Sequence, residues 1–337
     1  MKAVGYRKSL PITAEDALVD LDLPTPKPGP RDLLVAVKAV SVNPVDTKVR
    51  VRAAPPEGEA KILGWDAAGV VEAVGSEVSL FKPGDEVFYA GSIERPGTNA
   101  EYHLVDERIV GHKPRRLSFA EAAALPLTSI TAWELLFDRL GVRPGKPADA
   151  GSLLIIGGAG GVGSMLTQLA RRLTGLTVIA TASRPETAAW CRELGAHHVI
   201  DHTKPLAEEL KRIGLRQVAY VAGLTQTDRH FPAIAEILRP QGRFGLIDDP
   251  KTLDITPLKR KSISVHWELM FTRASFETDD MIAQHRLLDE VAGLVDDGIV
   301  RTTLAERFGT INAANLKRAH ALIESGRSKG KIVLEGF

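Results

Sequence analysis

The sequence predicts an α/β protein with two domains, one a Rossmann-type doubly wound parallel sheet and the other rich in β-strands. An apolar run at 153–156 leads directly into a glycine-rich turn and then into a helical pattern. From there strand and helix patterns alternate, as βαβ units with a parallel sheet require. Up to about Pro126 the chain instead shows short strand patterns separated by turn residues. A chain of 337 residues is long enough for two domains.

The individual elements follow from these patterns. In the first part, strands are expected at 33–37, 69–74 and 85–89, and a helical bridge begins at Ala120. Further strands are expected at 152–157, 177–182, 198–201, 217–221, 243–247 and 262–267, with helices over about 161–174 and 185–194. Helices then dominate until a last strand at 331–334.

The glycine-rich turn is predicted to bind the phosphates of a dinucleotide. Gly158, Gly160 and Gly163 match the spacing G-x-G-x-x-G, which supplies a tight turn, a close approach for pyrophosphate and close packing of helix on strand. The helix that follows offers free N–H groups to an anion. The predicted contacts are Gly158, Ala159, Gly160, Gly161, Val162 and Gly163. The alternative is a tight βα turn without a ligand.

Composition limits the classes of function. The 43 Lys and Arg residues nearly balance the 42 Asp and Glu residues, so no strong field would recruit nucleic acid or an anionic membrane. The single cysteine, Cys191, excludes an internal disulfide and a multi-thiolate zinc site, and we expect it to be inert. The N-terminus lacks a signal-peptide pattern, and no apolar stretch reaches the roughly 18 residues of a membrane span. We therefore expect a cytoplasmic protein that acts on small molecules.

Five segments carry a family resemblance that extends over nearly the whole chain. They are SVNPVDTK at 41–48, GWDAAGVV at 64–71, KPGDEV at 82–87, the glycine turn, and GKIVL at 330–334. The chain resembles the zinc-free quinone oxidoreductases, the zeta-crystallin-like branch of the medium-chain dehydrogenase/reductase superfamily, whose members are often labelled zinc-type alcohol dehydrogenase-like. The resemblance implies a GroES-like catalytic domain formed by 1–125 and 268–337, a Rossmann domain at 126–267, an active cleft at their junction, and a homodimer.

No metal is expected. The resemblance implies that zinc-dependent relatives have a cysteine near Asn43 and Gly-His-Glu where this chain has Gly64-Trp65-Asp66. A catalytic zinc needs about three ligands from Cys, His or carboxylate side chains. One cysteine cannot restore them, and the histidines lie at no metal-ligand spacing.

The cofactor is predicted to be NADPH. In domains that bind NAD, an acidic residue about twenty positions beyond the glycine turn accepts hydrogen bonds from the ribose. This chain has Ser183 and Arg184 there, which suit a 2′-phosphate. The alternative is that Ser183 only caps the helix entered at Pro185 and that Arg184 is solvated.

The resemblance implies further cofactor contacts at strand ends. His202 would lie near the adenosine phosphate, or would be a surface turn residue. Lys331 would approach the cofactor, or would be solvated, and Thr128 would lie near the nicotinamide, or would cap a helix. Further implied cofactor contacts lie in the segments 222–225, 245–247 and 266–269. They are Gly223, Leu224, Thr225, Gly245, Leu246, Ile247 and Trp267.

Reduction without a metal requires hydrogen-bond donors or a cation at the acceptor oxygen. The catalytic candidates are Asn43, Lys48, Tyr89 and, from the resemblance, Thr128, with Asp46 orienting Lys48. Alternatively, Asn43 and Pro44 only form a turn, and the Tyr89 hydroxyl lies in water.

Trp65, Tyr89, Trp267 and Phe271 are candidates to line an apolar substrate pocket. The alternative for Trp267 and Phe271 is a place in the core. The leading hypothesis is hydride transfer from NADPH to quinones or α,β-unsaturated carbonyls in the inter-domain cleft. Loops at 48–62 and 89–99 would shape the acceptor site. An enoyl-thioester reductase is an alternative that would use Arg50, Arg52 and Lys61, although these resemble a solvated loop. A non-enzymatic protein that binds NADPH or RNA is another, which the balanced charge disfavours.

Overall fold

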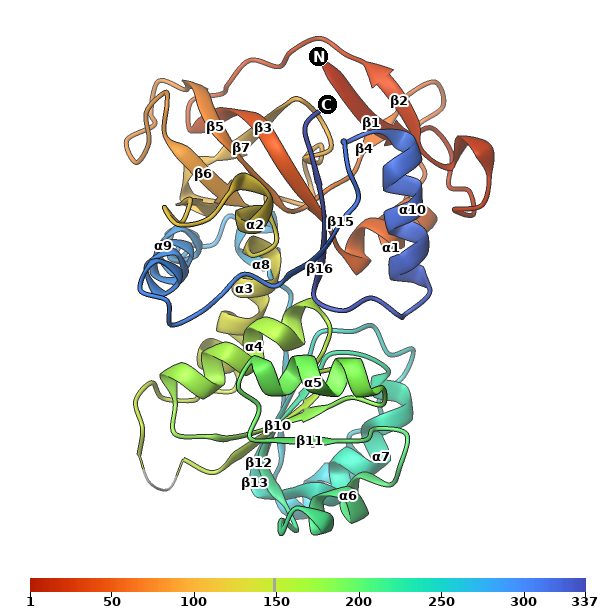
Figure 1. The fold of residues 1–337 in the computed structure, drawn as a ribbon, viewed down its shortest axis with the longest axis vertical. Helices are drawn as coiled ribbons and strands as arrows, with labels where there is room; N and C mark the ends of the chain where they lie inside the picture. The colour runs from red at the N-terminus through yellow and green to blue at the C-terminus, as the bar shows by residue number, and fades with distance from the viewer. Residues whose placement is uncertain (148–149) are drawn as a thin grey trace. The chain divides into compact units, whose positions relative to one another are not determined.

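The structure, a computed structural model, describes residues 1–147 and 150–337 (Figure 1). The chain forms two compact units, a terminal unit of Met1–Ile130 with Phe271–Phe337 and a central unit of Thr131–Met270. The chain passes from the terminal to the central unit after Ile130 and returns after Met270. Both of these crossings lie a few residues later than the expected boundaries at 125/126 and 267/268. The first crossing falls inside a continuous helix, α3 (Pro126–Trp133), so no turn residue marks it in the sequence.

The terminal unit is built on a sheet in the order β15-β16-β3-β5-β6-β8, with β7 also paired to β3. Strand β16, near the C-terminus, runs antiparallel to β3 and places Ile332 beside Val42, so both ends of the chain contribute to this unit (Figure 1). A smaller sheet has the order β2-β1-β4. The strands are β1 (Lys2–Tyr6), β2 (Val19–Asp22), β3 (Asp32–Val42), β4 (Lys61–Ile62), β5 (Ala67–Val74), β6 (Glu86–Tyr89), β7 (Tyr102–Asp106), β8 (Val110–His112), β15 (Leu304–Arg307) and β16 (Lys331–Glu335).

Helices α1 (Pro44–Arg52), α2 (Phe119–Ala123), α8 (Thr272–Ser275), α9 (Ile282–Asp296) and α10 (Ala313–Glu324) complete the terminal unit together with most of α3. Strand β15 was not expected, because its sequence lies between helical patterns and it forms by parallel pairing with β16. The loop expected at 48–62 begins later than predicted, because residues 48–52 are helical. Helix α1 continues to Arg52 although Val and Thr, which favour helices weakly, occupy much of it.

Arg50 is a further correction. The sequence suggested a solvated basic loop, but Arg50 lies on α1 and is fully buried. Its guanidinium donates to the carbonyl oxygen of Leu10 and pairs with the carboxylate of Glu324 on α10. A buried arginine needs such partners, so Arg50 joins two helices and does not present a surface charge.

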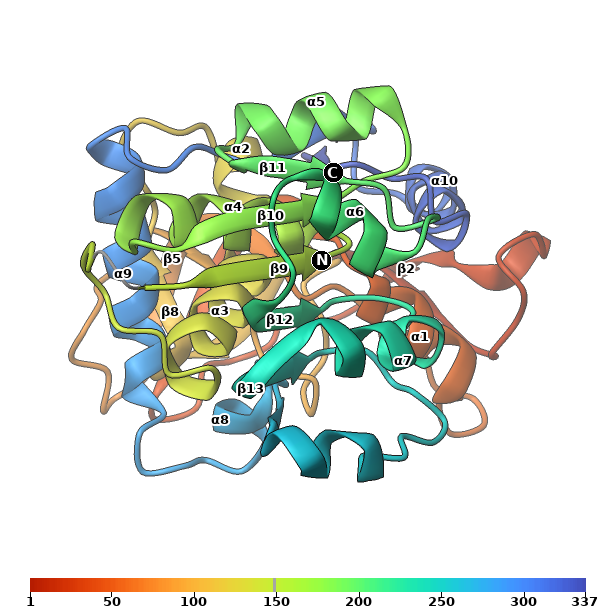
Figure 2. The ribbon, with the colours of Figure 1, turned by 90° about the horizontal axis from the view of Figure 1, so that it is seen from below.

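The central unit has the expected doubly wound fold. Its sheet has the order β11-β10-β9-β12-β13-β14, and every pairing is parallel. Helices α4 and α5 cover one face and α6 and α7 the other, and Figure 2 shows strands β11, β10, β9, β12 and β13 in this order. The elements are β9 (Ser152–Ile156), α4 (Gly161–Leu173), β10 (Thr177–Thr181), α5 (Pro185–Glu193), β11 (His198–Ile200), α6 (Leu206–Arg212), β12 (Val218–Gly223), α7 (Thr227–Ile237), β13 (Leu238–Leu246) and β14 (Ser264–Trp267), with a π-helix at Glu134–Arg139.

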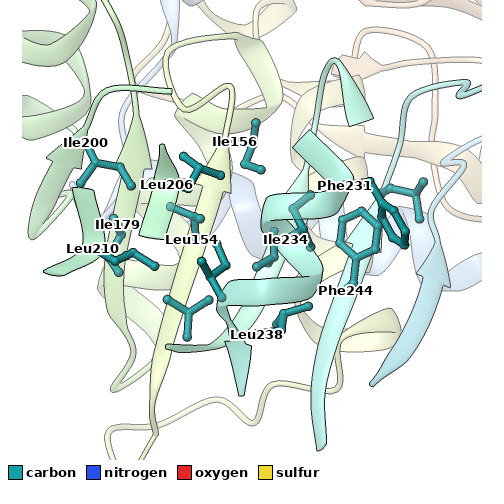
Figure 3. Close-up of a cluster of buried hydrophobic side chains, with 14 of the residues drawn as sticks. Leu154, Ile156, Ile179, Ile200, Leu206, Leu210, Phe231, Ile234, Leu238 and Phe244 are labelled. Carbon is teal, nitrogen blue, oxygen red and sulfur yellow. The ribbon is translucent and has the colours of Figure 1, made fainter. Parts of the chain in front are cut away.

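One hydrophobic cluster fills the face covered by α6 and α7 (Figure 3). Leu154 and Ile156 point from β9 into this cluster because alternate residues of a strand share a face. The helices contribute Leu206, Leu210, Phe231 and Ile234. This packing holds β9 in the middle of the sheet and fixes the point at which the glycine turn begins. Among the described residues, no helix combines the length and apolarity needed to cross a bilayer.

Candidate functional site

The carboxyl ends of the six parallel strands meet along one edge of the central sheet. The pairing places Ile156 beside Gly223, Gly223 beside Leu246, and Leu246 beside Trp267. Ligands of doubly wound sheets bind at this edge. The structure brings together there the predicted cofactor residues of the central unit: 158–163 after β9, Ser183 and Arg184 after β10, His202 after β11, 223–225 at the end of β12, 245–247 at the end of β13, and Trp267 at the end of β14.

The glycine turn requires glycine for two different reasons. A Cβ at Gly163 would lie 2.4 Å from the Gly157 carbonyl oxygen, and one at Gly158 would lie 2.7 Å from the Cβ of Ala180. Both contacts are closer than real Cβ atoms come. Gly160, the N-cap of α4, has open space, since its Cβ would meet only the Gly157 oxygen at 3.5 Å. Gly158 and Gly163 therefore permit packing, whereas Gly160 leaves the backbone accessible to an anion.

Ser183 and Arg184 lie on the surface after β10. Arg184 is the N-cap of α5, so the alternative that Ser183 caps this helix is wrong. The Arg184 Nε lies 2.9 Å from a carboxylate oxygen of Glu186, and 37% of the Arg184 side chain is exposed. No acidic side chain occupies positions 183 and 184, so a 2′-phosphate would meet a hydroxyl and a guanidinium there.

His202 lies on the same edge beside His230, with their ring centroids 6.1 Å apart. Burial lowers the pKa of His202 below its ordinary value. The imidazole is therefore neutral at pH 7 and can form a hydrogen bond to an adenosine group but carries no positive charge for a phosphate.

In the terminal unit, four buried polar side chains form what we call the Lys331 cluster: Asn43, Asp46, Asp66 and Lys331. None is more than 3% exposed. The Lys331 ammonium donates to the Val42 carbonyl oxygen at 3.1 Å, to Asp66 Oδ2 at 2.9 Å, and to Asn43 Oδ1. An ammonium has three N–H donors, and all three are used here. The alternative of a solvated Lys331 is wrong, and its predicted contact with the cofactor has no ammonium donor left to form it.

Asp66 holds the cluster together, although it is not among the site residues predicted from the sequence. Its Oδ2 also accepts from the Asn43 side-chain amide at 2.7 Å, and its Oδ1 accepts from the backbone N–H of Leu127 at 2.7 Å. Leu127 is in the first turn of α3, where N–H groups have no partner inside the helix. In the sequence, Asp66 follows Trp65 in the motif that the resemblance aligns with zinc ligands, and this position could have pointed to a functional residue. Only the fold shows what Asp66 binds.

Asp46 has a different role from the one predicted. Its Oδ2 accepts from the backbone N–H of Asn43 at 2.5 Å, which completes the first turn of α1. Burial raises the pKa of Asp46 to about 7, while this N–H and Lys331 oppose the increase. Lys48 lies two positions further along the same helix, a spacing that does not bring side chains together. The charge facing Asp46 is that of Lys331.

Tyr89 does not match its predicted role either. It is fully buried, and its hydroxyl lies 3.2 Å from Nδ1 of His103. The other ring nitrogen of His103 lies 2.9 Å from the Pro96 carbonyl oxygen, which can only accept, so Nδ1 carries no proton and the tyrosine donates. The hydroxyl proton is thus occupied, and the alternative of a hydroxyl in water is also wrong.

The remaining terminal-unit residues are buried. Thr128 lies in the first turn of α3 and donates its hydroxyl to the Leu125 carbonyl oxygen at 3.1 Å. Trp65 and Phe271 pack edge to face with ring centroids 6.1 Å apart, and the Trp65 indole N–H donates to Ser92. Trp65 therefore occupies the interior of the terminal unit, whereas Trp267 is 55% exposed in the central unit.

The two positions that the resemblance pairs with zinc ligands, Asn43 and Asp66, belong to the Lys331 cluster. Over residues 1–147 and 150–337, no three His, Cys, Asp or Glu side chains group as metal ligands. At the position where the resemblance would place the metal, the carboxylate of Asp66 already binds the Lys331 ammonium. A second cation there would be repelled.

Comparisons with known proteins agree with this architecture. Residues 29–129 match the alcohol dehydrogenase GroES-like domain, and residues 194–334 match the zinc-binding dehydrogenase family. The zinc-type alcohol dehydrogenase-like protein SACOL2177 of Staphylococcus aureus (strain COL) is 41% identical over 99% of both chains.

Solved structures are similar along the whole chain. A protein of Rhizobium etli CFN 42, described as a zinc-dependent alcohol dehydrogenase protein, is 62% identical to this chain. The TM-score is 0.96, and the match covers 100% of this chain and 98% of that one. The quinone oxidoreductase of Escherichia coli, in complex with NADPH, is 26% identical with a TM-score of 0.85, covering 99% and 100% of the two chains.

Proposed function

Since this chain belongs to the medium-chain dehydrogenase/reductase superfamily, an oxidoreductase family that uses nicotinamide cofactors, we propose that it is a zinc-independent reductase of quinones or α,β-unsaturated carbonyls that uses NADPH. The observation that carries the proposal is the Lys331 cluster, in which a buried ammonium holds the Asp66 carboxylate. The solved quinone oxidoreductase with NADPH supports the substrate class and the cofactor.

The central sheet would hold the cofactor. Gly160 leaves room for the pyrophosphate, Arg184 and Ser183 would contact the 2′-phosphate, and the ends of β12 to β14 would contact the nicotinamide half. When bound, NADPH supplies the hydride. The protein contributes the backbone N–H groups of the glycine turn, the dipole of α4 and the Arg184 charge.

Negative charge on the acceptor oxygen needs a donor in the protein. The side chains of Asn43 and Asp46 are bound within the Lys331 cluster, so we assign them to positioning the start of α1. Lys48 lies on that helix outside the cluster and is half-buried. We assign to Lys48 the stabilisation of the oxyanion, with the proton delivered from water.

Two assays test this proposal. NADPH oxidation should be measured with a small quinone and a panel of enones, with and without EDTA, and we expect turnover that the chelator leaves unchanged. Lys48→Met should lower kcat by about 10- to 100-fold while the Kd for NADPH stays constant. Binding of NADPH without turnover of any acceptor would reject the substrate class, and loss of activity in EDTA would reject zinc independence.

The enoyl-thioester alternative loses one of its three basic residues, because Arg50 is buried. We also propose that the chain forms a homodimer, which light scattering coupled to gel filtration would measure.

A further inference from the structure

Two buried glutamates in the central unit lie beside the same arginine. Glu134, the first residue of the π-helix, is 0% exposed, and Glu268, directly after β14, is 3% exposed. Both carboxyl groups lie beside the same guanidinium, that of Arg139. Arg139, at the other end of the π-helix, places its Nε 2.8 Å from Glu268 Oε2 and an Nη 3.7 Å from Glu134 Oε2. We call these residues the Glu–Glu–Arg triad.

One of the two buried carboxyl groups must hold a proton. Two buried carboxylates beside one guanidinium would leave a negative charge without a counter-ion. Burial and the neighbouring Glu134 raise the pKa of Glu268, whereas Arg139 opposes the increase. With one carboxylic acid, one carboxylate and one guanidinium, the buried group has no net charge. Loss of the proton would leave two carboxylates in contact with one arginine.

The triad joins parts of the chain that meet at the predicted cofactor edge. The backbone N–H of Glu268 donates to the Leu246 carbonyl oxygen at 3.0 Å, between segments 245–247 and 266–269. The π-helix packs directly on β13, since a Cβ at Gly245 would lie 2.5 Å from a methyl carbon of Leu135. Arg243 of β13 also donates to the Leu140 carbonyl oxygen at 2.7 Å. π-Helical turns often occur at functional sites.

The triad lies close to both points at which the chain passes between the two units. The chain enters the central unit at Thr131 and leaves it at Met270, so both glutamates lie within a few residues of a crossing. Within the central unit, the triad therefore ties the incoming segment to the outgoing one.

We propose that the Glu–Glu–Arg triad is a clamp that positions the ends of β13 and β14 for binding of the nicotinamide cofactor. The identity of the cofactor rests on the proposed function above. Glu134, Glu268 and Arg139 act here as positioning residues. Deprotonation of the pair pushes the two carboxylates apart, displaces Glu268 and moves the adjacent Trp267 at the predicted cofactor edge.

The other charged groups near the triad do not titrate in the same range. Arg243 is a guanidinium and stays charged. Burial lowers the pKa of His266, and Arg243 and Arg139 lower it further, so this imidazole is neutral throughout the alkaline range. A change between pH 7 and 9.5 therefore reports on the carboxyl pair. The 2′-phosphate of NADPH, with a second pKa of about 6, is already about nine-tenths ionised at pH 7, so its titration accounts for little of the expected change.

The test measures the Kd for NADPH by calorimetry at pH 7 and at pH 9.5 on the full chain. We expect the Kd of the unmodified protein to rise at least tenfold between the two. Glu268→Gln keeps a hydrogen-bond donor but has no proton to lose, so its Kd should change less than twofold. The matched control is Glu208→Gln, on the surface of α6 in an ion pair with Lys211, which should keep the full tenfold change.

A second readout does not depend on the cofactor. Emission of the exposed Trp267 should shift between pH 7 and 9.5, and the shift should disappear in Trp267→Phe and in Glu268→Gln. A flat pH response in the unmodified protein, or a full response in Glu268→Gln, would overturn the clamp. If NADPH does not bind at pH 7, the proposed function fails, and the emission shift alone decides whether the clamp exists.

Discussion

The glycine turn of the central unit and the Lys331 cluster of the terminal unit are built in opposite ways. The turn consists of consecutive residues at 157–163 and presents backbone groups, with no side chain needed. The cluster joins side chains from segments far apart in the chain, at 43–46, 66 and 331, with the backbone N–H of Leu127. The turn should therefore tolerate changes of charge nearby but no added volume at Gly158 or Gly163. The cluster should tolerate small changes of volume but no change of charge.

The largest expected effect is on the cluster. Lys331→Met preserves much of the side-chain length but leaves Asp66 buried without its cation, which should cost about 3–5 kcal/mol in the free energy of unfolding. Urea denaturation measures it. Lys38→Met, on the exposed face of β3, should change the stability by less than about 0.5 kcal/mol. In the double variant with Asp66→Asn, part of the loss should be recovered, and strict additivity would show that the two residues do not interact.

The next effect is a pH dependence that originates in the cluster. The pKa of Asp46 is raised from 3.8 to about 7, so between these values the folded protein keeps a proton that the unfolded chain has lost. By linkage, this contribution to stability is present below pH 4 and is lost as the pH rises through 7. Asp46→Asn removes it.

Other carboxyl groups also titrate over this pH range. The unmodified protein and the Asp46→Asn variant must therefore be compared with each other at each pH. The stability of the unmodified protein minus that of Asp46→Asn should fall by on the order of 2–4 kcal/mol between pH 4 and 8. Urea titrations at several pH values give this difference. A constant or rising difference would contradict the assignment.

The glycine turn should respond to volume. Gly163→Ala forces a methyl group against the Gly157 carbonyl oxygen at 2.4 Å and should cost about 1–3 kcal/mol of stability. Gly160→Ala is the matched comparison, because its methyl group meets nothing closer than 3.5 Å. It should lose less stability than Gly163→Ala but still raise the Kd for NADPH. Equal thermal stability of the two variants would show that packing does not separate these glycines.

The smallest expected effect concerns cofactor choice. Arg184→Ala should raise the Kd for NADPH about tenfold, equivalent to about 1.4 kcal/mol, and leave that for NADH unchanged. Arg192→Ala, on the exposed surface of the same helix, serves as the control. Equal affinity of the unmodified protein for NADPH and NADH would reject the cofactor assignment.

Prediction from sequence succeeded where the signal is local. The strands and helices of the central unit follow from apolar runs and glycines, and the parallel sheet follows from their alternation. The same reasoning failed at α1 and β15. Helix α1 has β-branched residues and no clear helical periodicity, and β15 exists because β16 offers it an edge.

Side-chain roles were predicted less well than elements. Lys331 and Arg50 were both weighed as solvated cations, the usual state of such residues, yet both are buried with acidic partners from distant segments. Tyr89 was chosen for its hydroxyl, but the hydroxyl donates to His103. No spacing in the sequence indicates these pairings.

The sequence by itself determined the doubly wound sheet and the glycine turn, because strand periodicity, steric limits on glycine and helix termini act within a few residues. It also determined the lack of an acidic side chain at 183–184. Only the tertiary structure decided which charges meet: Lys331 with Asp66, Asp46 at the start of α1, and Glu134 with Glu268. Burial makes these pairings obligatory, because an unpaired charge removed from water costs several kcal/mol, and burial arises only when distant segments pack together.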